Sequence, residues 1–190
     1  MSNLKELTWE HHKNAERQKF VKELMGGNIT NERYATYLFN QHPQYDILEA
    51  IAMMQGHFNG APALRRAPSI LADFEQLWAG GDKERPPLCP VVNDYVEHMK
   101  TIMDDPQKIM AHVYVRHMGD LSGGQMIARK APGEGRMYQF DTDKKQLKES
   151  IRAKINDDMA EEAKYCFTAS TNLFKELMEL DIEPYLEQTN

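Results

Sequence analysis

One acid, Asp120, stands among three glycines in the segment 111–130, which reads A-H-V-Y-V-R-H-M-G-D-L-S-G-G-Q-M-I-A-R-K. The glycines are Gly119, Gly123 and Gly124. Each glycine inside a helix costs about 1 kcal/mol relative to alanine, so the chain must gain something from the missing side chains. Glycine lets a backbone approach a flat ligand or another helix closely, or lets a helix bend. A buried acid is costly unless it is paired, so Asp120 should cap a helix, form a salt bridge or take part in chemistry. Helical spacing offers Arg116, four residues earlier, as its structural partner.

A pair of adjacent histidines, His11 and His12, offers a second kind of chemistry. At about 100° per residue, His11 falls on the apolar stripe of its predicted helix and His12 falls near the edge of that stripe. Glu16 follows His12 by four residues, so its carboxylate can reach the imidazole on the same face. Ligating histidines are commonly oriented by a carboxylate in this way. The same pattern also fits two ordinary histidines on a helix surface.

The other histidines and the cysteines match no known metal motif. His112 and His117 do not form HExxH or another zinc spacing, which argues against zinc. Cys89 and Cys166 stand alone in the sequence and are expected to be reduced thiols. The glycine segment is neither a P-loop nor a dinucleotide-binding motif, because no GK[ST] follows and no strand precedes it.

The composition excludes several classes of protein. The 190 residues suit one domain, 1–190, with a single core. A net charge of -6 with scattered Lys and Arg argues against nucleic-acid binding. No window approaches the ~18 apolar residues of a membrane span, and the N-terminal residues MSNLKELTWE do not resemble a signal peptide. We therefore expect a cytoplasmic protein without a membrane segment.

Helices must position these residues, because the hydrophobic pattern is helical throughout and strand signals are almost absent. Predicted helices span 4–16, a short segment through Phe20 and Leu24 that stops at Gly26 and Gly27, 30–58 with Pro43 inside, 69–78 closed by Gly80 and Gly81, 91–103, a helix from Pro106 that carries the glycine segment, 144–156 and 159–180. The sequence therefore predicts an all-α, single-domain bundle of helices.

The segment 114–125, Y-V-R-H-M-G-D-L-S-G-G-Q, resembles the signature of the haem oxygenases, which typically reads Y-x-R-x-L-G-D-L-S-G-G-Q. The segment 4–16, L-K-E-L-T-W-E-H-H-K-N-A-E, is similar to the helix of that family that carries the proximal histidine. The segment 161–177 is similar to the family's last helix. The resemblance implies a haem oxygenase-like multi-helix bundle, with haem sandwiched between a proximal and a kinked distal helix.

On the proximal side, the resemblance places the axial ligand of the haem iron at His12, not at His11, with Glu16 as the nearby acid. On the distal side, it places the backbone of Gly119 and Gly123 against the haem face. Asp120 is then the residue that orders water around bound oxygen. Tyr45 and Arg116 match members of the same distal network.

The resemblance also implies contacts at the edge of the haem. Tyr114 matches a position near that edge, and Lys5, Lys148 and Arg152 match basic residues near the propionates. Apolar positions of the last helix are matched by Phe167 and Phe174. Two residues depart from the pattern: Trp9 stands where some relatives have a second lysine, and Ser170 where some have an asparagine.

The implied function is oxidative opening of the haem ring at a meso carbon, the alpha carbon by resemblance, to biliverdin, carbon monoxide and ferrous iron. Haem is then both substrate and cofactor, and O2 is the oxidant. Electrons must come from an external donor, a ferredoxin or a flavoprotein reductase, because no flavin or nicotinamide motif is present; a bilin reductase could follow. Two alternatives are a haem-binding protein without turnover and a helical protein without haem.

Overall fold

The central element of the structure is α4 (Asn31–Met54), a helix buried along most of its length. Thr30 caps its N-terminus, because its side chain accepts a hydrogen bond from the amide of Arg33 at 3.2 Å. The helix continues through Pro43, which the sequence predicted to lie inside it. Helices α5 (Ala67–Leu77), α6 (Pro90–Ile102) and α7 (Pro106–Leu121) all pack against α4.

This computed structural model describes residues 1–78 and 85–182, so Gly80 and Gly81 lie outside the described residues. Within that range all regular elements are helices and none is a strand, which confirms the predicted all-α class. The remaining elements are α1 (Leu4–Leu7), α2 (Trp9–Glu16), α3 (Lys19–Gly26), the 3-10 helix η1 (Pro62–Leu64), α8 (Gly124–Ile127), η2 (Arg136–Tyr138), α9 (Lys144–Arg152), η3 (Asp157–Met159) and α10 (Ala160–Glu179). Among the described helices, none has the length and apolarity needed to cross a membrane.

The glycine segment forms two helices with a break between them. Asp105 caps α7 through the amides of Gln107 and Lys108, and Pro106 occupies the first turn as predicted. The helix ends at Leu121, and Ser122 leaves the helical conformation with φ -117° and ψ -94°. Helix α8 then begins at Gly124. The predicted kink is therefore a break at Ser122, whereas Gly119 stays inside α7.

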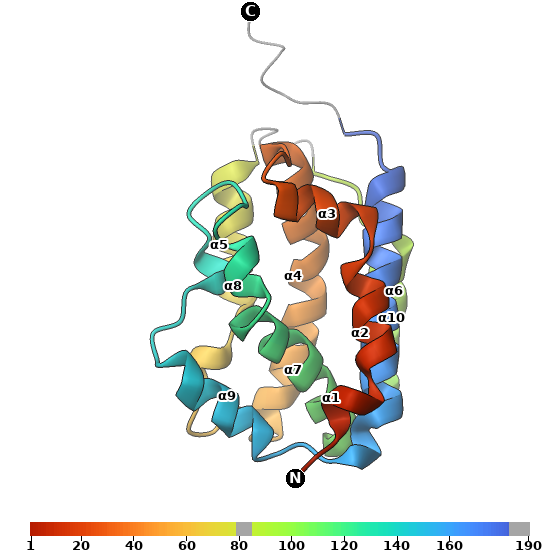
Figure 1. Ribbon diagram of the computed structural model, residues 1–190, viewed down its shortest axis with the longest axis vertical. Coiled ribbons are helices and arrows are strands. Elements are labelled where there is room, and N and C mark those ends of the chain that lie inside the picture. Colours follow the sequence, from red (N-terminus) through yellow and green to blue (C-terminus); the bar gives the residue numbers. More distant parts are fainter. Residues whose placement is uncertain (79–84, 183–190) are drawn as a thin grey trace, which may run out of the picture.

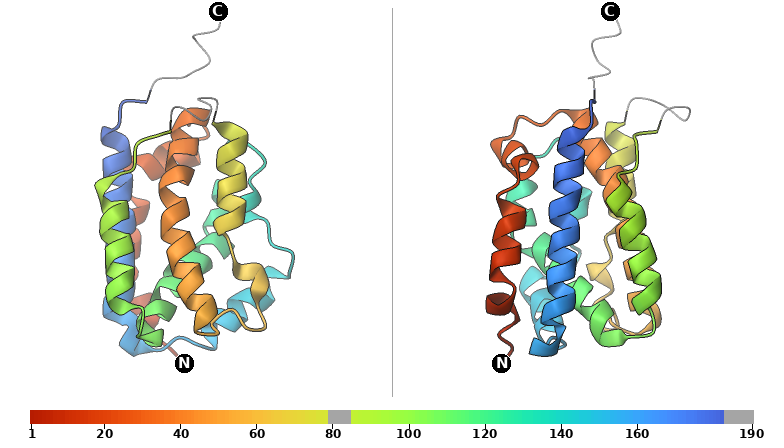
Figure 2. Two further views of the ribbon diagram at one scale, coloured as in Figure 1. Left: turned by 180° about the vertical axis from the view of Figure 1, so that it is seen from behind. Right: turned by 90° about the vertical axis from the view of Figure 1, so that its right-hand side faces the viewer.

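Helix α10 joins the two halves of the site, because both α2 and α7 pack against it. In Figure 1, α2, α10 and α4 run along the long axis of the molecule, and α7 crosses α4 at a slant. The views in Figure 2 show α10 between α2 and α6 on one side of the molecule. The segments 9–16 and 106–121, far apart in sequence, are thus both anchored on one helix.

Several predicted helix boundaries differ from the structure: the helix predicted over 144–156 ends at Arg152, and two further differences have a local cause. The predicted helix 4–16 is divided at Thr8, whose hydroxyl donates to the carbonyl of Leu4 at 2.8 Å. This local bond competes with regular helix geometry. Helix α4 ends at Met54, four residues before the predicted end at Phe58, and Gly56 follows with φ +77°. That conformation suits glycine and cannot continue a right-handed helix.

Candidate functional site

Asp120 and Tyr45 form the centre of the distal side of the site. The hydroxyl of Tyr45 on α4 donates a hydrogen bond to Oδ2 of Asp120 on α7 at 2.8 Å. Both side chains are buried, with 2% and 6% of their surface exposed. The two residues are 75 positions apart in the sequence, and the packing of α7 on α4 brings them together. The structure therefore places the predicted acid and the predicted tyrosine in direct contact.

Burial raises the pKa of the Asp120 carboxyl from 3.8 to about 7. Loss of hydration penalises the carboxylate, while His117, the Tyr45 hydroxyl, Arg66 and Arg116 lower the pKa without cancelling that penalty. Burial also raises the pKa of Tyr45 well above 10. Asp120 therefore holds and releases a proton near neutral pH, while Tyr45 remains a hydrogen-bond donor.

Arg116 does not form the salt bridge with Asp120 that helical spacing suggests. No ion pair of Asp120 occurs among the residues that the structure describes. The guanidinium instead donates to Gln44 Oε1 at 2.7 Å and to the Tyr95 hydroxyl at 3.1 Å. It also lies 5.3 Å from the centre of the Tyr45 ring. Arg116 thus belongs to the same buried network as Asp120 and reaches it through Tyr45. The interpretation of Asp120 as a salt-bridge partner of Arg116 is therefore wrong.

Sequence reasoning missed Gln41, Gln44 and Tyr95 as members of this network. Gln41 Oε1 lies 3.3 Å from Arg116 Nη1, and Gln41 Nε2 donates to the Tyr37 hydroxyl at 2.8 Å. A signal was present on α4, since Gln41, Gln44 and Tyr45 have the i, i+3, i+4 spacing of one helix face. A polar face on a buried helix indicates a hydrogen-bond network, because buried polar groups need partners.

A second buried network lies beside the first. His117 Nε2 is 2.8 Å from Glu49 Oε2, and both side chains are buried. Glu49 also accepts from the amides of Arg66 and Ala67, at the start of α5. The Arg66 guanidinium donates to the carbonyls of Met137 and Gln139, around η2. This network fixes the segments around η1 and η2 against α4 and α7.

The three glycines separate into two groups by what surrounds them. A Cβ added to Gly119 or Gly123 would have no heavy atom within 4 Å, whereas one added to Gly124 would lie 2.6 Å from Cε1 of Tyr138. Of these three positions, packing inside the protein therefore requires glycine at 124 alone. Positions 119 and 123 leave bare backbone facing open space, next to Asp120. Such backbone is suited to close approach by a flat ligand.

His12 has the surroundings of a candidate axial ligand. Its Nε2 lies 2.9 Å from Oε1 of Glu16, so the carboxylate orients the ring, and 38% of the side chain is exposed. The imidazole stacks on Phe167 of α10, with 5.3 Å between ring centres. Trp9 meets the same ring edge-on at 5.7 Å. One ring nitrogen is thus held by a carboxylate, which leaves the other for a metal.

The predicted edge residues lie on three helices, α1, α7 and α9, of which α7 and α9 pack against each other. Tyr114 on α7 hydrogen-bonds Thr8, and burial raises its pKa while Thr8 and the charge of Arg152 oppose that rise. Arg152 ends α9 and is exposed. Lys5 is exposed on α1, Lys148 is half-buried on α9, and neither takes part in an ion pair within the described residues.

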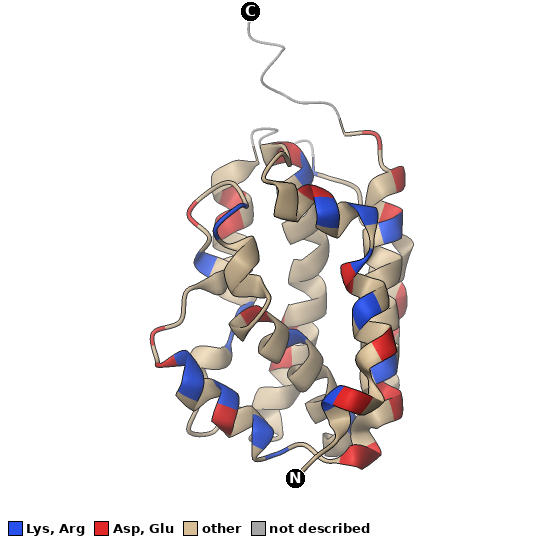
Figure 3. Cartoon of the chain, viewed as in Figure 1, with Lys and Arg blue, Asp and Glu red and all other residues tan. Residues whose placement is uncertain are grey.

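Helix α9 is the basic element of this edge. It carries the four basic residues Lys144, Lys145, Lys148 and Arg152 against one acid, Glu149, which gives a net charge of +3. Figure 3 shows these basic bands along α9, in a chain whose overall charge is -6. The helix therefore offers unpaired positive charge for carboxylates at the edge of a ligand.

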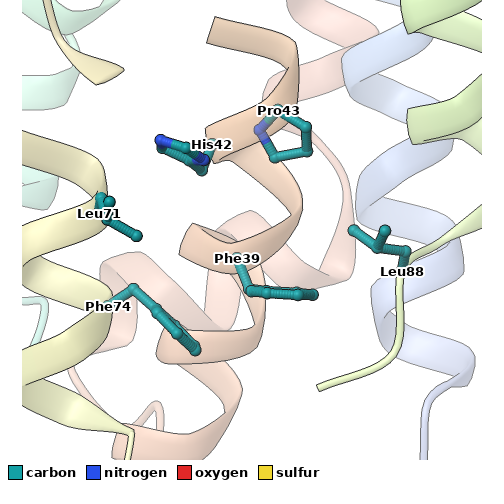
Figure 4. A pocket seen from close by; sticks show the side chains of 6 residues that line it. All are labelled: Phe39, His42, Pro43, Leu71, Phe74 and Leu88. Carbon is teal, nitrogen blue, oxygen red and sulfur yellow. The ribbon is translucent and has the colours of Figure 1, made fainter. Parts of the chain in front are cut away.

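An apolar hollow lies on the opposite face of α4 and is a separate feature. It is lined by Phe39, His42, Pro43, Leu71, Phe74 and Leu88 (Figure 4). On a helical projection, Phe39, His42 and Pro43 point away from Gln41, Gln44 and Tyr45. The hollow therefore does not border the Asp120 network.

The predicted residues thus form three groups, and the structure does not bring them all into mutual contact. His12, Glu16 and Phe167 lie on α2 and α10, Asp120, Tyr45 and Arg116 lie between α4 and α7, and Tyr114 and Arg152 mark the edge. Ser170 and Phe174 are half-buried on α10, where Phe174 stacks on Phe20 at 5.7 Å between ring centres. One exposed imidazole, bare glycine backbone and unpaired cations fit a flat plate with an iron and two carboxylates.

Comparison with known proteins gives one consistent family. A sequence model described as "Heme oxygenase" matches residues 1–179. The rabbit (Oryctolagus cuniculus) protein "Heme oxygenase 2" is 31% identical over 211 residues, which cover 97% of this chain and 68% of that protein. The macaque (Macaca fascicularis) protein of the same name is 33% identical over 92% of this chain, but the match spans only 64% of its length.

A solved structure gives the same family for the fold. The crystal structure of heme oxygenase-1 from the cyanobacterium Synechocystis, in complex with heme, superimposes with a TM-score of 0.81 and 25% identity. The superposition covers 93% of this chain and 90% of that chain. This similarity confirms the predicted multi-helix bundle of the haem oxygenase type.

Proposed function

Because the chain belongs to the haem oxygenase family, we propose that it binds one haem between α2 and α7 and opens the ring at its alpha meso carbon. The products are biliverdin, carbon monoxide and ferrous iron. Haem is the substrate, and its iron supplies the redox chemistry with O2 and electrons from an external donor. The observation that carries the proposal is the bare backbone of Gly119 and Gly123 beside the buried Asp120.

On the proximal side, His12 is the proposed iron ligand. Its contact with Glu16 holds the ring in one tautomer and makes the free nitrogen a better donor. The stacked ring of Phe167 fixes the plane of the imidazole. A single protein ligand leaves the other face of the haem open to oxygen.

On the distal side, Asp120 is the proposed proton donor through ordered water. Its pKa of about 7 lets the carboxyl hold a proton near neutral pH and release it without a large cost. Tyr45 fixes the orientation of the carboxyl through its hydrogen bond, and the Arg116 guanidinium lies over the ring of Tyr45 and limits its movement. Gly119 and Gly123 bring the backbone close to the haem face and exclude bulk water from it.

At the edge, the propionates are proposed to meet Lys5, Lys148 and Arg152, with Tyr114 close to the ring. These cations lie on α1 and α9, and the helix α9 carries a net charge of +3. Pairing with the two carboxylates would fix the rotation of the haem about the iron–His12 axis. That rotation decides which meso carbon faces Asp120.

The proposed electron donor is a ferredoxin or a flavoprotein reductase that docks at the basic edge. Opposite charges speed the encounter of such partners, and an acidic donor would suit α9. A bilin reductase that accepts the product is a further proposed partner. The cytoplasmic location expected from the sequence stays a prediction.

The experiment that tests the proposal starts with haemin and the purified chain. We expect a tight one-to-one complex with a strong Soret band. Addition of a reductant under O2 should convert it to a product with the absorbance of biliverdin and release one carbon monoxide per haem. A complex that forms but gives no bilin would indicate a haem-binding protein without turnover, and no complex would refute haem as the ligand.

A further inference from the structure

Two histidines and a glutamate from three helices meet on the side of α7 that packs against α6 and α10. They are His98 on α6, His112 on α7 and Glu162 on α10. Oε1 of Glu162 lies 2.7 Å from Nε2 of His112 and also contacts Nε2 of His98. One potential ligand atom from each residue lies within 4.8 Å of the other two. None of these residues belongs to the proposed haem site.

Within the cluster, His112 is buried and held in place, whereas His98 and Glu162 are partly accessible to solvent. The side chain of His112 is fully buried, whereas His98 and Glu162 are 22% and 13% exposed. Tyr165 stacks on the ring of His98, with 3.8 Å between ring centres, and so limits its rotation. An ion from solvent could therefore reach His98 and Glu162 first and then meet His112 in a fixed position.

The hydrogen bonds behind His112 suit a ligating imidazole. Nδ1 of His112 lies 2.7 Å from the hydroxyl of Tyr95. Arg116 can only donate, and its Nε donates to the same hydroxyl oxygen at 3.1 Å. The proton of Tyr95 is then available for the sulfur of Cys166, with which Tyr95 is hydrogen-bonded. Tyr95 can thus accept from Nδ1–H of His112, whose Nε2 then faces Oε1 of Glu162 at hydrogen-bond distance.

In the metal-free protein these two atoms share a proton, and a divalent cation that binds here would displace it. Two imidazole nitrogens and one carboxylate oxygen form a donor set that zinc and ferrous iron use in sites with open positions. With bonds of about 2.1 Å, ligand atoms in such a site stand roughly 3.4 Å apart. The three ligand atoms, which lie within 4.8 Å of one another, need only side-chain adjustments to reach these positions.

We propose that His98, His112 and Glu162 bind one divalent first-row transition-metal ion. The ion would link α6, α7 and α10 and would leave at least one coordination position for water. Through Tyr95, the bound ion would also fix Arg116 and thereby the distal network. The proposal does not depend on haem turnover, because the cluster can be tested in the haem-free protein.

The test uses the haem-free chain after treatment with a chelating resin. We would titrate it with Zn2+ by calorimetry and with Co2+ by visible absorption, which reports the coordination geometry. The wild-type chain should bind one equivalent of each ion, and Zn2+ should displace Co2+ and abolish its visible bands. Metal should also raise the melting temperature, because the ion binds the folded state.

Variants assign the site. His98→Ala and Glu162→Gln should each weaken binding at least tenfold, and both affect partly exposed side chains, so the fold should persist; circular dichroism checks this. His42→Ala is the matched control at a distant histidine, and His12→Ala tests the proposed haem ligand; neither should change metal affinity. Absence of a one-equivalent site, equal binding by His98→Ala, or loss of binding only in His12→Ala would each overturn the proposal.

Discussion

Tyr45 donates its hydrogen bond to Asp120 across the contact between α4 and α7, over a distance of 2.8 Å. This bond and the burial around it act in opposite directions on the acid. The hydrogen bond favours the carboxylate, while burial favours the protonated carboxyl and dominates. The result is a buried acid with a pKa of about 7 beside bare glycine backbone.

The raised pKa of Asp120 predicts how stability depends on pH. The folded state holds the proton more tightly than the unfolded state, where the pKa is near 3.8. The cost of ionising the acid is therefore absent below pH 4, grows between pH 4 and 7, and is complete above 7. At about 1.4 kcal/mol per pH unit, this cost is roughly 3–5 kcal/mol.

Asp120→Asn removes that cost and should stabilise the haem-free protein relative to wild type, increasingly from pH 4 to pH 7. Denaturant unfolding at several pH values measures the difference. The matched control is Asp46→Asn, an exposed residue of α4, which should show no such gain. A stability difference for Asp120→Asn that is independent of pH would contradict the buried, protonated acid.

Alanine in place of glycine should have opposite effects on stability at positions 124 and 119. Gly124→Ala places a methyl group 2.6 Å from the Tyr138 ring and should destabilise the haem-free protein by about 1–3 kcal/mol. Gly119→Ala meets no atom within 4 Å and should stabilise the haem-free protein by up to about 1 kcal/mol, because alanine favours helix. It should nevertheless weaken haem binding and bilin formation, since the methyl group enters the space of the ligand.

Thermal unfolding and haemin titration of both variants separate these effects. If Gly119→Ala bound haem and formed bilin as well as wild type, the backbone at position 119 would not face the haem.

The two adjacent histidines give a third prediction. His12→Ala should lose the nitrogen ligand of the ferric iron, and His11→Ala should keep it, because only His12 has both the Glu16 contact and the Phe167 stack. Electron paramagnetic resonance and the Soret position of the haemin complex report the ligand. Added imidazole should restore the spectrum of His12→Ala. The reverse pattern would assign the ligand to His11.

The basic helix α9 gives a fourth prediction. Lys148→Glu should lower turnover with an acidic ferredoxin several-fold, and rising salt should reduce the wild-type rate toward that of the variant. Lys100→Glu on α6 is the control, since Lys100 lies outside α9. Turnover that ignores both salt and Lys148→Glu would place the donor elsewhere.

A second readout separates docking from haem seating. With a small-molecule reductant, Lys148→Glu should lose less activity than with the ferredoxin, because the variant then loses only the proposed contact with a propionate and not the docking of a protein donor.

The helices could be predicted because their signals are local. Thr30, Asp105 and Pro106 lie at the helix starts that their chemistry predicts. The break at Thr8 was missed because a threonine that bonds back to the carbonyl of Leu4 looks like any other helical threonine in sequence. The single-domain organisation over 1–190 stays a prediction.

The candidate site was predictable only where motif resemblance covered it. Local spacing predicted Arg116 as the partner of Asp120. In the packed structure Arg116 instead donates hydrogen bonds to Gln44 and Tyr95. His98 and Glu162 are 64 residues apart, and no periodicity connects them. Contacts between distant helices depend on the whole packing, which patterns in one sequence do not contain.

The most direct test of the central claim, that α7 supplies the distal chemistry for a haem held by His12, is the product of one turnover by Asp120→Ala. The variant should bind haemin with an unchanged stoichiometry and Soret band, since Asp120 is not an iron ligand. With reductant and O2 it should form less than about a tenth of the wild-type biliverdin, because general acid catalysis by a positioned residue contributes at least that much. A full yield of biliverdin from Asp120→Ala would contradict the account.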